Sequence, residues 1–303
     1  MRVNLLRKID KHLGQVVCKI ILLFKQTFLI FSSRNQLEIS KDLRKVLIIK
    51  FFGMGTILLS SPAIGELKKK FPQSEIIFLT LAQNKEVCET LPSIDKVLLL
   101  RIDGLLNFLR DFIGIVFMVR ASKVDIVIDL EFLTNFSALT TLLFTVFNCN
   151  IRSIGFNSPM KWRNSAYTLN VAFDHSRHIS KIFGKVMASI CGEISNINFD
   201  AEKKALLKTA ETGFLNDILC QRNSEENLSR LVCVNINSGP LSFLRRWPEK
   251  YFSILVGELV RKPNTKIVLI GGPSDIDYVQ NFYDKQESKE QVINLCGQLS
   301  FHK

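Results

Sequence analysis

Apolar residues along the chain form short continuous runs, separated by stretches in which they recur every three or four positions. The first run, Val46 to Ile49, predicts a strand that is buried on both faces. Gly53 and Gly55 follow it and allow a sharp bend and a close approach to a ligand. Apolar positions from Ile57 to Phe71 then have helical spacing. A strand, glycine loop and helix form the first unit of a nucleotide- or sugar-binding domain, although such a loop can also be a tight turn that binds nothing.

This alternation continues through the chain. We predict further strands at 75–79, 96–100, 124–130, 151–156, 231–236, 266–270 and 292–295. We predict further helices at 83–90, 104–121, 136–147, 179–191, 201–220, 248–260 and 276–284. Strands that alternate with helices indicate parallel sheets with right-handed crossovers. The fold class is therefore α/β, with two Rossmann-like, doubly wound domains.

The predicted elements divide the folded part of the chain into three segments. Residues 45–172 form an N-terminal Rossmann-like domain, 173–230 connecting helices, and 231–303 a second domain of the same type. Three strands and two helices make only half of a doubly wound domain, so we expect the second domain to be incomplete. Alone, its first strand would be an exposed apolar edge, which implies a truncated copy or completion by another chain.

Residues 1–34 mix apolar and basic side chains. Lys11, Lys19 and Lys25 interrupt the apolar residues, so no run reaches the roughly 20 residues of a membrane-spanning helix. The small-residue cleavage site of a signal peptide is also missing. This pattern favours a basic amphipathic helix in the interface of an anionic membrane, or one packed on its own protein.

Composition and charge limit the classes of partner that the chain can bind. The 303 residues are 47% hydrophobic and 22% charged, which suits two domains with sizeable cores and excludes global disorder. The net charge of +12 favours an anionic partner, such as a phosphorylated substrate or a membrane. Nucleic acid is not expected, because the basic residues are dispersed. The seven cysteines include no C-x-x-C pair, which indicates buried thiols in a reducing compartment and no metal site.

Polar residues follow two of the predicted strands, at the end where open α/β sheets bind ligands. Asp129 and Glu131 lie at the carboxyl end of the strand at 124–130, although carboxylates there can also be helix caps. Asn237 and Ser238 follow the first strand of the second domain, where backbone donors suit a phosphate.

Five segments together resemble a known family. They are KVLIIKFFGMGTILLSSPAIGELKKKFP, VDIVIDLEFLTNFSALTTLL with RSIGF, HSRHIS, VNINSGPLSFLRRWPEKYF, and IVLIGGPSDIDYV with VINLCGQLS. In this order they resemble glycosyltransferase family 9, the heptosyltransferase family of lipopolysaccharide synthesis, over residues 45–300. The resemblance implies a GT-B fold, in which two Rossmann-like domains face a cleft.

The resemblance also implies an activity and its location. The N-terminal domain would bind a glycolipid acceptor, and the C-terminal domain an ADP-activated sugar. Transfer would be inverting and independent of metals and other cofactors, on the cytoplasmic face of the bacterial inner membrane. Lys50, Gly53 and Gly55 would face the acceptor. Arg245 stands where the family has a basic residue that contacts the donor diphosphate; otherwise it is a solvated charge at a helix start.

Two departures from the family pattern limit this prediction. The family has an aspartate at position 56 as general base, but Thr56 can only form hydrogen bonds near neutral pH. We hypothesise that Glu131, or else Asp129, replaces that base. The family's later aspartate–glycine–histidine segment would fall beyond Lys303. The alternative function is an inactive truncated remnant, or a non-catalytic sugar- or nucleotide-binding module.

Overall fold

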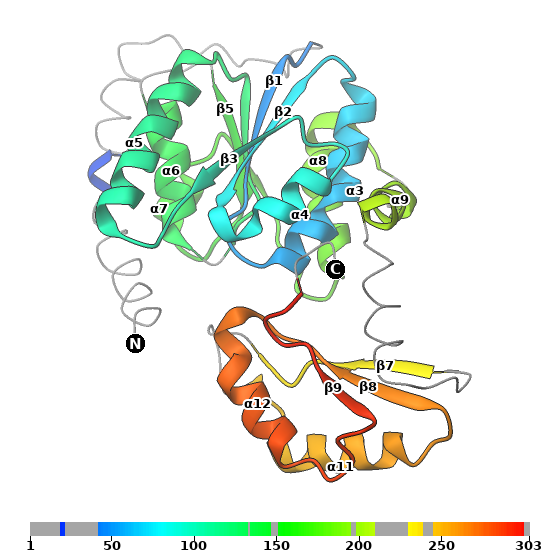
Figure 1. The fold of residues 1–303 in the computed structure, drawn as a ribbon. Coiled ribbons are helices and arrows are strands. Elements are labelled where there is room, and N and C mark those ends of the chain that lie inside the picture. Colours follow the sequence, from blue (N-terminus) through cyan, green and yellow to red (C-terminus); the bar gives the residue numbers. More distant parts are fainter. Residues whose placement is uncertain are drawn as a thin grey trace, which may run out of the picture. The chain divides into compact units, whose positions relative to one another are not determined.

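A computed structural model of the chain describes residues 19–21, 42–132, 134–146, 151–194, 198–209, 230–238 and 245–299. Its contacts divide the chain into two compact units, Met1–Lys208 and Thr209–Lys303 (Figure 1). The division falls within the region 173–230, in which we placed the connection. Apart from residues 19–21, the predicted membrane-associating segment 1–34 lies outside the described residues.

The first unit is built on a six-stranded parallel sheet. Its strands are β1 (Lys45–Ile49), β2 (Glu75–Leu81), β3 (Lys96–Leu100), β4 (Ile126–Asp129), β5 (Arg152–Phe156) and β6 (Leu169–Val171). Their order is β3-β2-β1-β4-β5-β6, and every neighbouring pair is parallel. The chain winds outward in one direction from β1 and in the other from β4. The point between these two strands is where sheets of this kind bind ligands.

Helices cover both faces of this sheet (Figure 1). They are α3 (Met54–Lys70), η2 (Ala82–Asn84), α4 (Lys85–Thr90), α5 (Leu105–Ala121), α6 (Asn135–Thr145), α7 (Lys161–Asn164), α8 (Ile179–Cys191) and α9 (Asp200–Thr209). Helices α5 and α6 lie on one face, and α3 packs against α8 on the other. Among the described residues, no helix combines the length and the apolar character that crossing a membrane requires.

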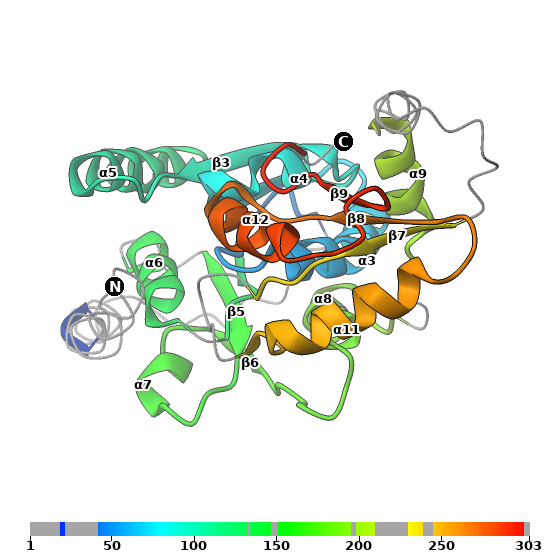
Figure 2. The same ribbon diagram turned by 60° about the horizontal axis from the view of Figure 1, so that its bottom comes forward.

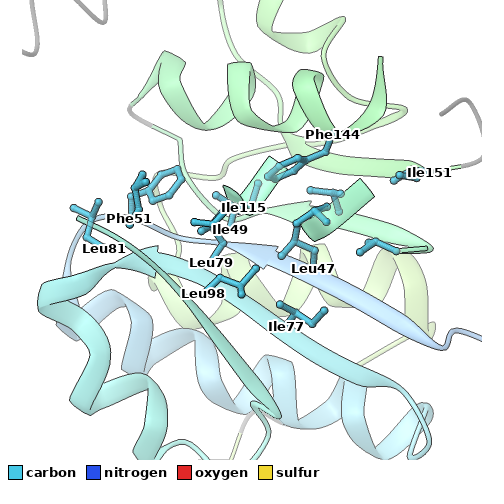
Figure 3. Packing of buried hydrophobic residues seen from close by; sticks show 14 residues of the cluster. Leu47, Ile49, Phe51, Ile77, Leu79, Leu81, Leu98, Ile115, Phe144 and Ile151 are labelled. Carbon is cyan, nitrogen blue, oxygen red and sulfur yellow. The ribbon is translucent and has the colours of Figure 1, made fainter. Parts of the chain in front are cut away.

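The core explains why the first apolar run is a strand. Residues 46–49 of β1 are completely buried, because helices cover the sheet on both sides. On the α5 side, Leu47 and Ile49 pack with Leu79, Ile115 and Phe144 (Figure 3). Side chains from four strands and two helices thus meet in one apolar layer, and this layer holds the ends of β1 and β4 in fixed positions.

One predicted irregular stretch contains two regular elements. We expected residues 157–177 to lack secondary structure, but α7 and β6 lie there. Strand β6 has only three residues, and none of them is buried, so no apolar run marks it in the sequence. It is added to the sheet edge by pairing with β5. The helix predicted at 201–220 is described only as α9, and its second half lies outside the described residues.

The second unit contains a smaller sheet of the same type. Strands β7 (Arg230–Val234), β8 (Thr265–Leu269) and β9 (Val292–Asn294) are parallel and lie in that order. Helices α11 (Glu249–Val260), η4 (Pro273–Asp275) and α12 (Ile276–Asp284) connect them. Only Val234 of β7 is buried, and Cys233 is exposed. In its described part the unit is therefore half of a doubly wound sheet with β7 at the edge, as predicted.

Candidate functional site

The candidate site of the first unit lies where β1 and β4 end. Ile49 is opposite Asp129 in the parallel register, so the segments that leave the two strands run side by side. The segment after β1 is the glycine loop, residues 50–53. The segment after β4 begins with Leu130 and Glu131. The sheet order therefore brings the two predicted site segments together, although about 80 positions separate them.

Glu131 holds the backbone of the glycine loop. Its Oε1 accepts hydrogen bonds from the amides of Phe51 (2.9 Å) and Phe52 (2.7 Å), and from Lys50 Nζ (3.1 Å). Lys50 Nζ also donates to the Phe52 carbonyl at 2.8 Å. Both charged side chains are only 2% exposed. They form a buried ion pair with most of its hydrogen-bonding capacity satisfied, the condition under which such a pair is tolerated.

The loop turns at Gly53, where φ is +84°, in the left-handed region that favours glycine. An added Cβ there would lie 2.7 Å from Thr56 Oγ1. Thr56 donates from that oxygen to the carbonyls of Gly53 (2.7 Å) and Phe52 (3.2 Å). The Thr56 hydroxyl, at the position where the resemblance implies a base, therefore donates to the loop that precedes α3. Gly55 lies in the first turn of α3, not in the loop, because Gly53 alone completes the bend.

The tip of the loop is the part that a ligand can reach. Gly53, Met54 and Gly55 are all exposed, and no atom lies within 4 Å of a Cβ placed on Gly55. Helix α3 begins at Met54, so the positive end of its dipole lies at this tip. An exposed helix start with little side-chain cover suits an anionic group such as a phosphate.

Asp129 belongs to a second buried network. Its Oδ1 accepts from the Glu131 amide at 2.9 Å, and its Oδ2 accepts from the Tyr167 hydroxyl at 2.6 Å. Arg163 lies 3.9 Å from Oδ2, and its Nη2 donates to the Glu131 carbonyl at 2.6 Å. Burial raises the pKa of Asp129, while the Arg163 guanidinium and the Tyr167 hydroxyl oppose the rise. Burial, and secondly Asp129, raise the pKa of Tyr167 well above its ordinary value.

Four buried charges thus meet at the ends of β1 and β4. Lys50 and Arg163 balance Asp129 and Glu131, and none of these residues is more than 2% exposed. We predicted the two carboxylates as candidate bases and Lys50 as an acceptor contact, and these roles stay predictions. The contacts of Glu131 and Lys50 favour a different role, which is to fix the shape of the glycine loop.

Sequence reasoning missed Arg163 and Tyr167, because both lie in the stretch expected to be irregular. A signal for Tyr167 is Gly155, in the motif RSIGF. An added Cβ on Gly155 would lie 2.4 Å from Cζ of the Tyr167 ring. Only glycine therefore leaves room for the Tyr167 ring beside β5, where its hydroxyl reaches Asp129.

This contact gives a prediction for stability. We expect Gly155→Ala to lower the free energy of unfolding by about 1–3 kcal/mol, because the Tyr167 ring must move out of a packed site. The matched control is Gly114→Ala on α5, where nothing lies within 4 Å of the added Cβ. The control should gain up to about 1 kcal/mol from helix propensity. Urea denaturation followed by circular dichroism measures both changes, and equal stability of the two variants would contradict the prediction.

The candidate site of the second unit lies where β7 and β8 end. Asn237 follows β7 and donates from Nδ2 to the Ile270 carbonyl at 3.3 Å. Its Oδ1 is buried without a hydrogen-bond partner among the described residues. A Cβ on Gly271 would lie 2.5 Å from Asn237 Nδ2, so Gly271 makes room for the amide. Ser238 comes next and is half-buried. The predicted phosphate-binding loop is thus at the carboxyl edge of the sheet.

Two neighbouring arginines beside this loop have different surroundings. Arg245 is exposed. Arg246 lies with Cζ 4.0 Å from the centre of the Tyr278 ring and Nη2 3.7 Å from Asp275 Oδ1. The ring of Trp247 stacks on Tyr251 with 5.4 Å between their centroids. Arg246 and Trp247 therefore pack against neighbouring side chains, whereas Arg245 is accessible to a ligand.

We compared the chain with known protein families, curated proteins and solved structures. No protein-family model matches the sequence, and a search of curated proteins finds no match. Among solved structures, a family 9 glycosyltransferase from Veillonella parvula superposes with a TM-score of 0.63 at 21% identity, over 86% of this chain and 70% of that one. The Escherichia coli heptosyltransferase WaaC with ADP superposes with a TM-score of 0.61 at 15% identity, over 83% of this chain and 74% of that one. E. coli heptosyltransferase II superposes with a TM-score of 0.58 at 15% identity, over 84% of this chain and 73% of that one.

These similarities confirm the predicted fold. The chain has the α/β architecture of the GT-B-like glycosyltransferases, with two Rossmann-like units, and its fold resembles that of family 9.

Proposed function

We propose that the chain is a glycosyltransferase that moves a sugar from an ADP-activated donor to a glycolipid acceptor. Heptose is the proposed sugar, and the lipopolysaccharide core or a related glycolipid is the proposed acceptor. The observation that carries this proposal is the Asn237–Ser238 loop with the exposed Arg245 after it, in a fold shared with a heptosyltransferase solved with ADP. Inversion, independence from metals and location at the inner face of the inner membrane belong to the same proposal.

The chemistry assigns a task to each unit. In an inverting transfer, the acceptor hydroxyl attacks the anomeric carbon while the bond to the diphosphate breaks. The leaving diphosphate would be stabilised by backbone amides near Asn237 and Ser238 and by the guanidinium of Arg245. The tip of the glycine loop, at Gly53 and the start of α3, would bind a phosphorylated part of the acceptor.

Binding of ADP to Arg245 variants tests the donor site. We expect Arg245→Ala to weaken ADP binding tenfold or more in calorimetry, because it removes a charge-assisted hydrogen bond of about 1.5–3 kcal/mol. The control is Arg261→Ala, which removes another exposed arginine of the same unit, one that pairs with Glu258. Equal ADP affinity of both variants would overturn the assignment of Arg245.

Thr56 favours one alternative, a nucleotide-sugar-binding module without transfer activity. Its hydroxyl donates to the backbone of the glycine loop before α3, and threonine cannot take the proton of an acceptor. Incubation with ADP-heptose and a glycolipid acceptor separates the two functions. Release of ADP that depends on the acceptor supports the transferase. Tight ADP binding without such release supports the module.

A further inference from the structure

Helix α5 exposes an unusually apolar side to solvent. Its large exposed side chains are Leu105, Leu106, Leu109, Ile113, Phe117 and Met118, and we call this set the α5 face. Leu106 is 84% exposed and Phe117 is 67% exposed. Apolar side chains that are exposed singly are normal on a protein surface, but a contiguous group on one helix marks an interaction site.

The opposite side of α5 is also apolar and already has a partner. Ile115 and Val119 are buried in the core of the first unit, with Phe108 and Phe112 packed beside them. Arg101 fixes this orientation by a two-point contact with Asp111, in which Nε–Oδ2 and Nη2–Oδ1 are each 2.7 Å. The α5 face is therefore held outward by the fold, and a helix that is apolar on both sides requires a second partner.

The charges around the α5 face suit an anionic partner. Between residues 101 and 123 there are four basic residues and two acidic ones. The Nε atom of Arg110 lies 3.8 Å from Asp111 Oδ1, yet 68% of the Arg110 side chain is exposed, and Lys123 is exposed just beyond the end of the helix. Of the two acidic residues, Asp111 is engaged by Arg101, whose hydrogen bond lowers the pKa of Asp111 to about 2.

The α5 face is also connected to the candidate acceptor site. Phe108 and Phe112 lie with their ring centroids 5.6 Å and 5.4 Å from that of Phe136. Phe136 in turn lies 5.1 Å from Phe51 in the glycine loop. The start of α5 is therefore beside the edge of the sheet at which the acceptor would bind.

A turn of the basic N-terminal segment lies on the same side of the sheet. Ile21 packs against the cluster formed by α6 and α7, which includes Leu142 and Trp162. Lys19 and Ile20 beside it are exposed. Figures 1 and 2 both place residues 19–21 on the side that α5 and α6 cover. Basic and apolar groups from two distant parts of the sequence thus share one side of the first unit.

We propose that the α5 face docks on the surface of an anionic phospholipid bilayer. Its leucines and Phe117 would enter the boundary between headgroups and acyl chains, and Arg110 would bind lipid phosphates. This inference rests on the proposed function and deepens it, because it names the surface that brings the glycine loop to a membrane-held glycolipid.

Vesicle flotation of the full-length chain tests the docking surface. We expect binding to vesicles of equal parts phosphatidylcholine and phosphatidylglycerol, and Leu106→Asp should weaken it at least tenfold. The control is Ile254→Asp on α11, which places the same charge at a 61% exposed apolar site and should change binding less than twofold. ADP affinity is measured for both variants, so that failure of the donor site is recognised separately from failure of this inference.

A fluorescence measurement locates the contact itself. The fluorescence of the introduced tryptophan is taken as the difference between variant and wild type. On vesicles whose lipids have brominated acyl chains, this fluorescence should be quenched in Phe117→Trp and unchanged in Ile254→Trp. Vesicle-bound protein with an unquenched tryptophan at position 117 would overturn the proposal and point to the N-terminal segment. Light scattering would overturn the proposal if it shows a dimer that Leu106→Asp dissociates while vesicle binding is unchanged. The α5 face would then bind a second copy of the chain.

Discussion

A Glu131→Gln variant is expected to lose about 3–5 kcal/mol of unfolding free energy, because the ammonium group of Lys50 would then be buried without its counter-charge. The glutamine can still accept from the amides of Phe51 and Phe52, so the change isolates the charge. The comparison is Glu75→Gln at the amino ends of β1 and β2, where both side chains of the Lys45–Glu75 pair are 37% exposed. Such surface pairs contribute about 0–1 kcal/mol. Urea denaturation of both variants measures the difference between their unfolding free energies.

A second substitution decides between a positioning role and a catalytic role for Glu131. Removing both charges, in Lys50→Met/Glu131→Gln, should recover most of the lost stability, since an apolar replacement of a buried ion pair is often neutral. A double-mutant cycle then gives the coupling energy of the pair. Hydrogen exchange of the Phe51 and Phe52 amides reports directly on the loop. If the amides remain protected and the double variant transfers sugar at the wild-type rate, Glu131 is a positioning residue.

The opposite outcome supports the role that we predicted from the sequence. A double variant that is stable and keeps its loop protected, yet transfers no sugar, would support a direct role of this pair in transfer. If the single variant Lys50→Met still transfers sugar, that role belongs to Glu131 as the general base. A Glu131→Gln variant as stable as wild type would instead contradict the structural argument, because the buried ion pair would then contribute nothing.

The sheet could be predicted because its strands leave a local signal. Residues 46–49 are covered on both faces, so the strand they form is a continuous apolar run. The same reasoning predicted that β7 lies at an edge, since three parallel strands in this topology leave the first one without a second neighbour. These features depend on periodicity and on chain order, both of which a sequence contains.

The buried charge network could not be predicted in the same way. Arg163 and Asp129 are 34 positions apart, and Arg163 comes from a four-residue helix without an apolar face of its own. Carboxylates at strand ends suggested a solvent-facing site, but the structure buries them because β4 is central and α7 lies over its end. Which polar residues pair inside a protein depends on tertiary contacts, and the spacing of the residues does not reveal them.

Arg163→Met is the second change with a large expected effect, again about 3–5 kcal/mol near neutral pH, since it leaves the Asp129 charge buried with neutral donors from Tyr167, Ser137 and the Glu131 amide but without the guanidinium. The carbonyls of Thr134 and Glu131 each lose the hydrogen bond from Arg163 as well. The control Arg177→Met removes an exposed arginine that pairs with Asp174 on the surface, and its stability should stay close to wild type.

The pH dependence separates the charge from the lost packing. Arg163 opposes the rise in the Asp129 pKa that burial causes, so its removal should raise that pKa further. The folded variant then binds a proton at pH values where the unfolded chain, with a pKa of about 3.9, has released it. Unfolding free energy therefore falls as pH rises through this window. The deficit of Arg163→Met should be larger at pH 8 than at pH 5, and a deficit independent of pH would assign the loss to packing and carbonyl hydrogen bonds instead.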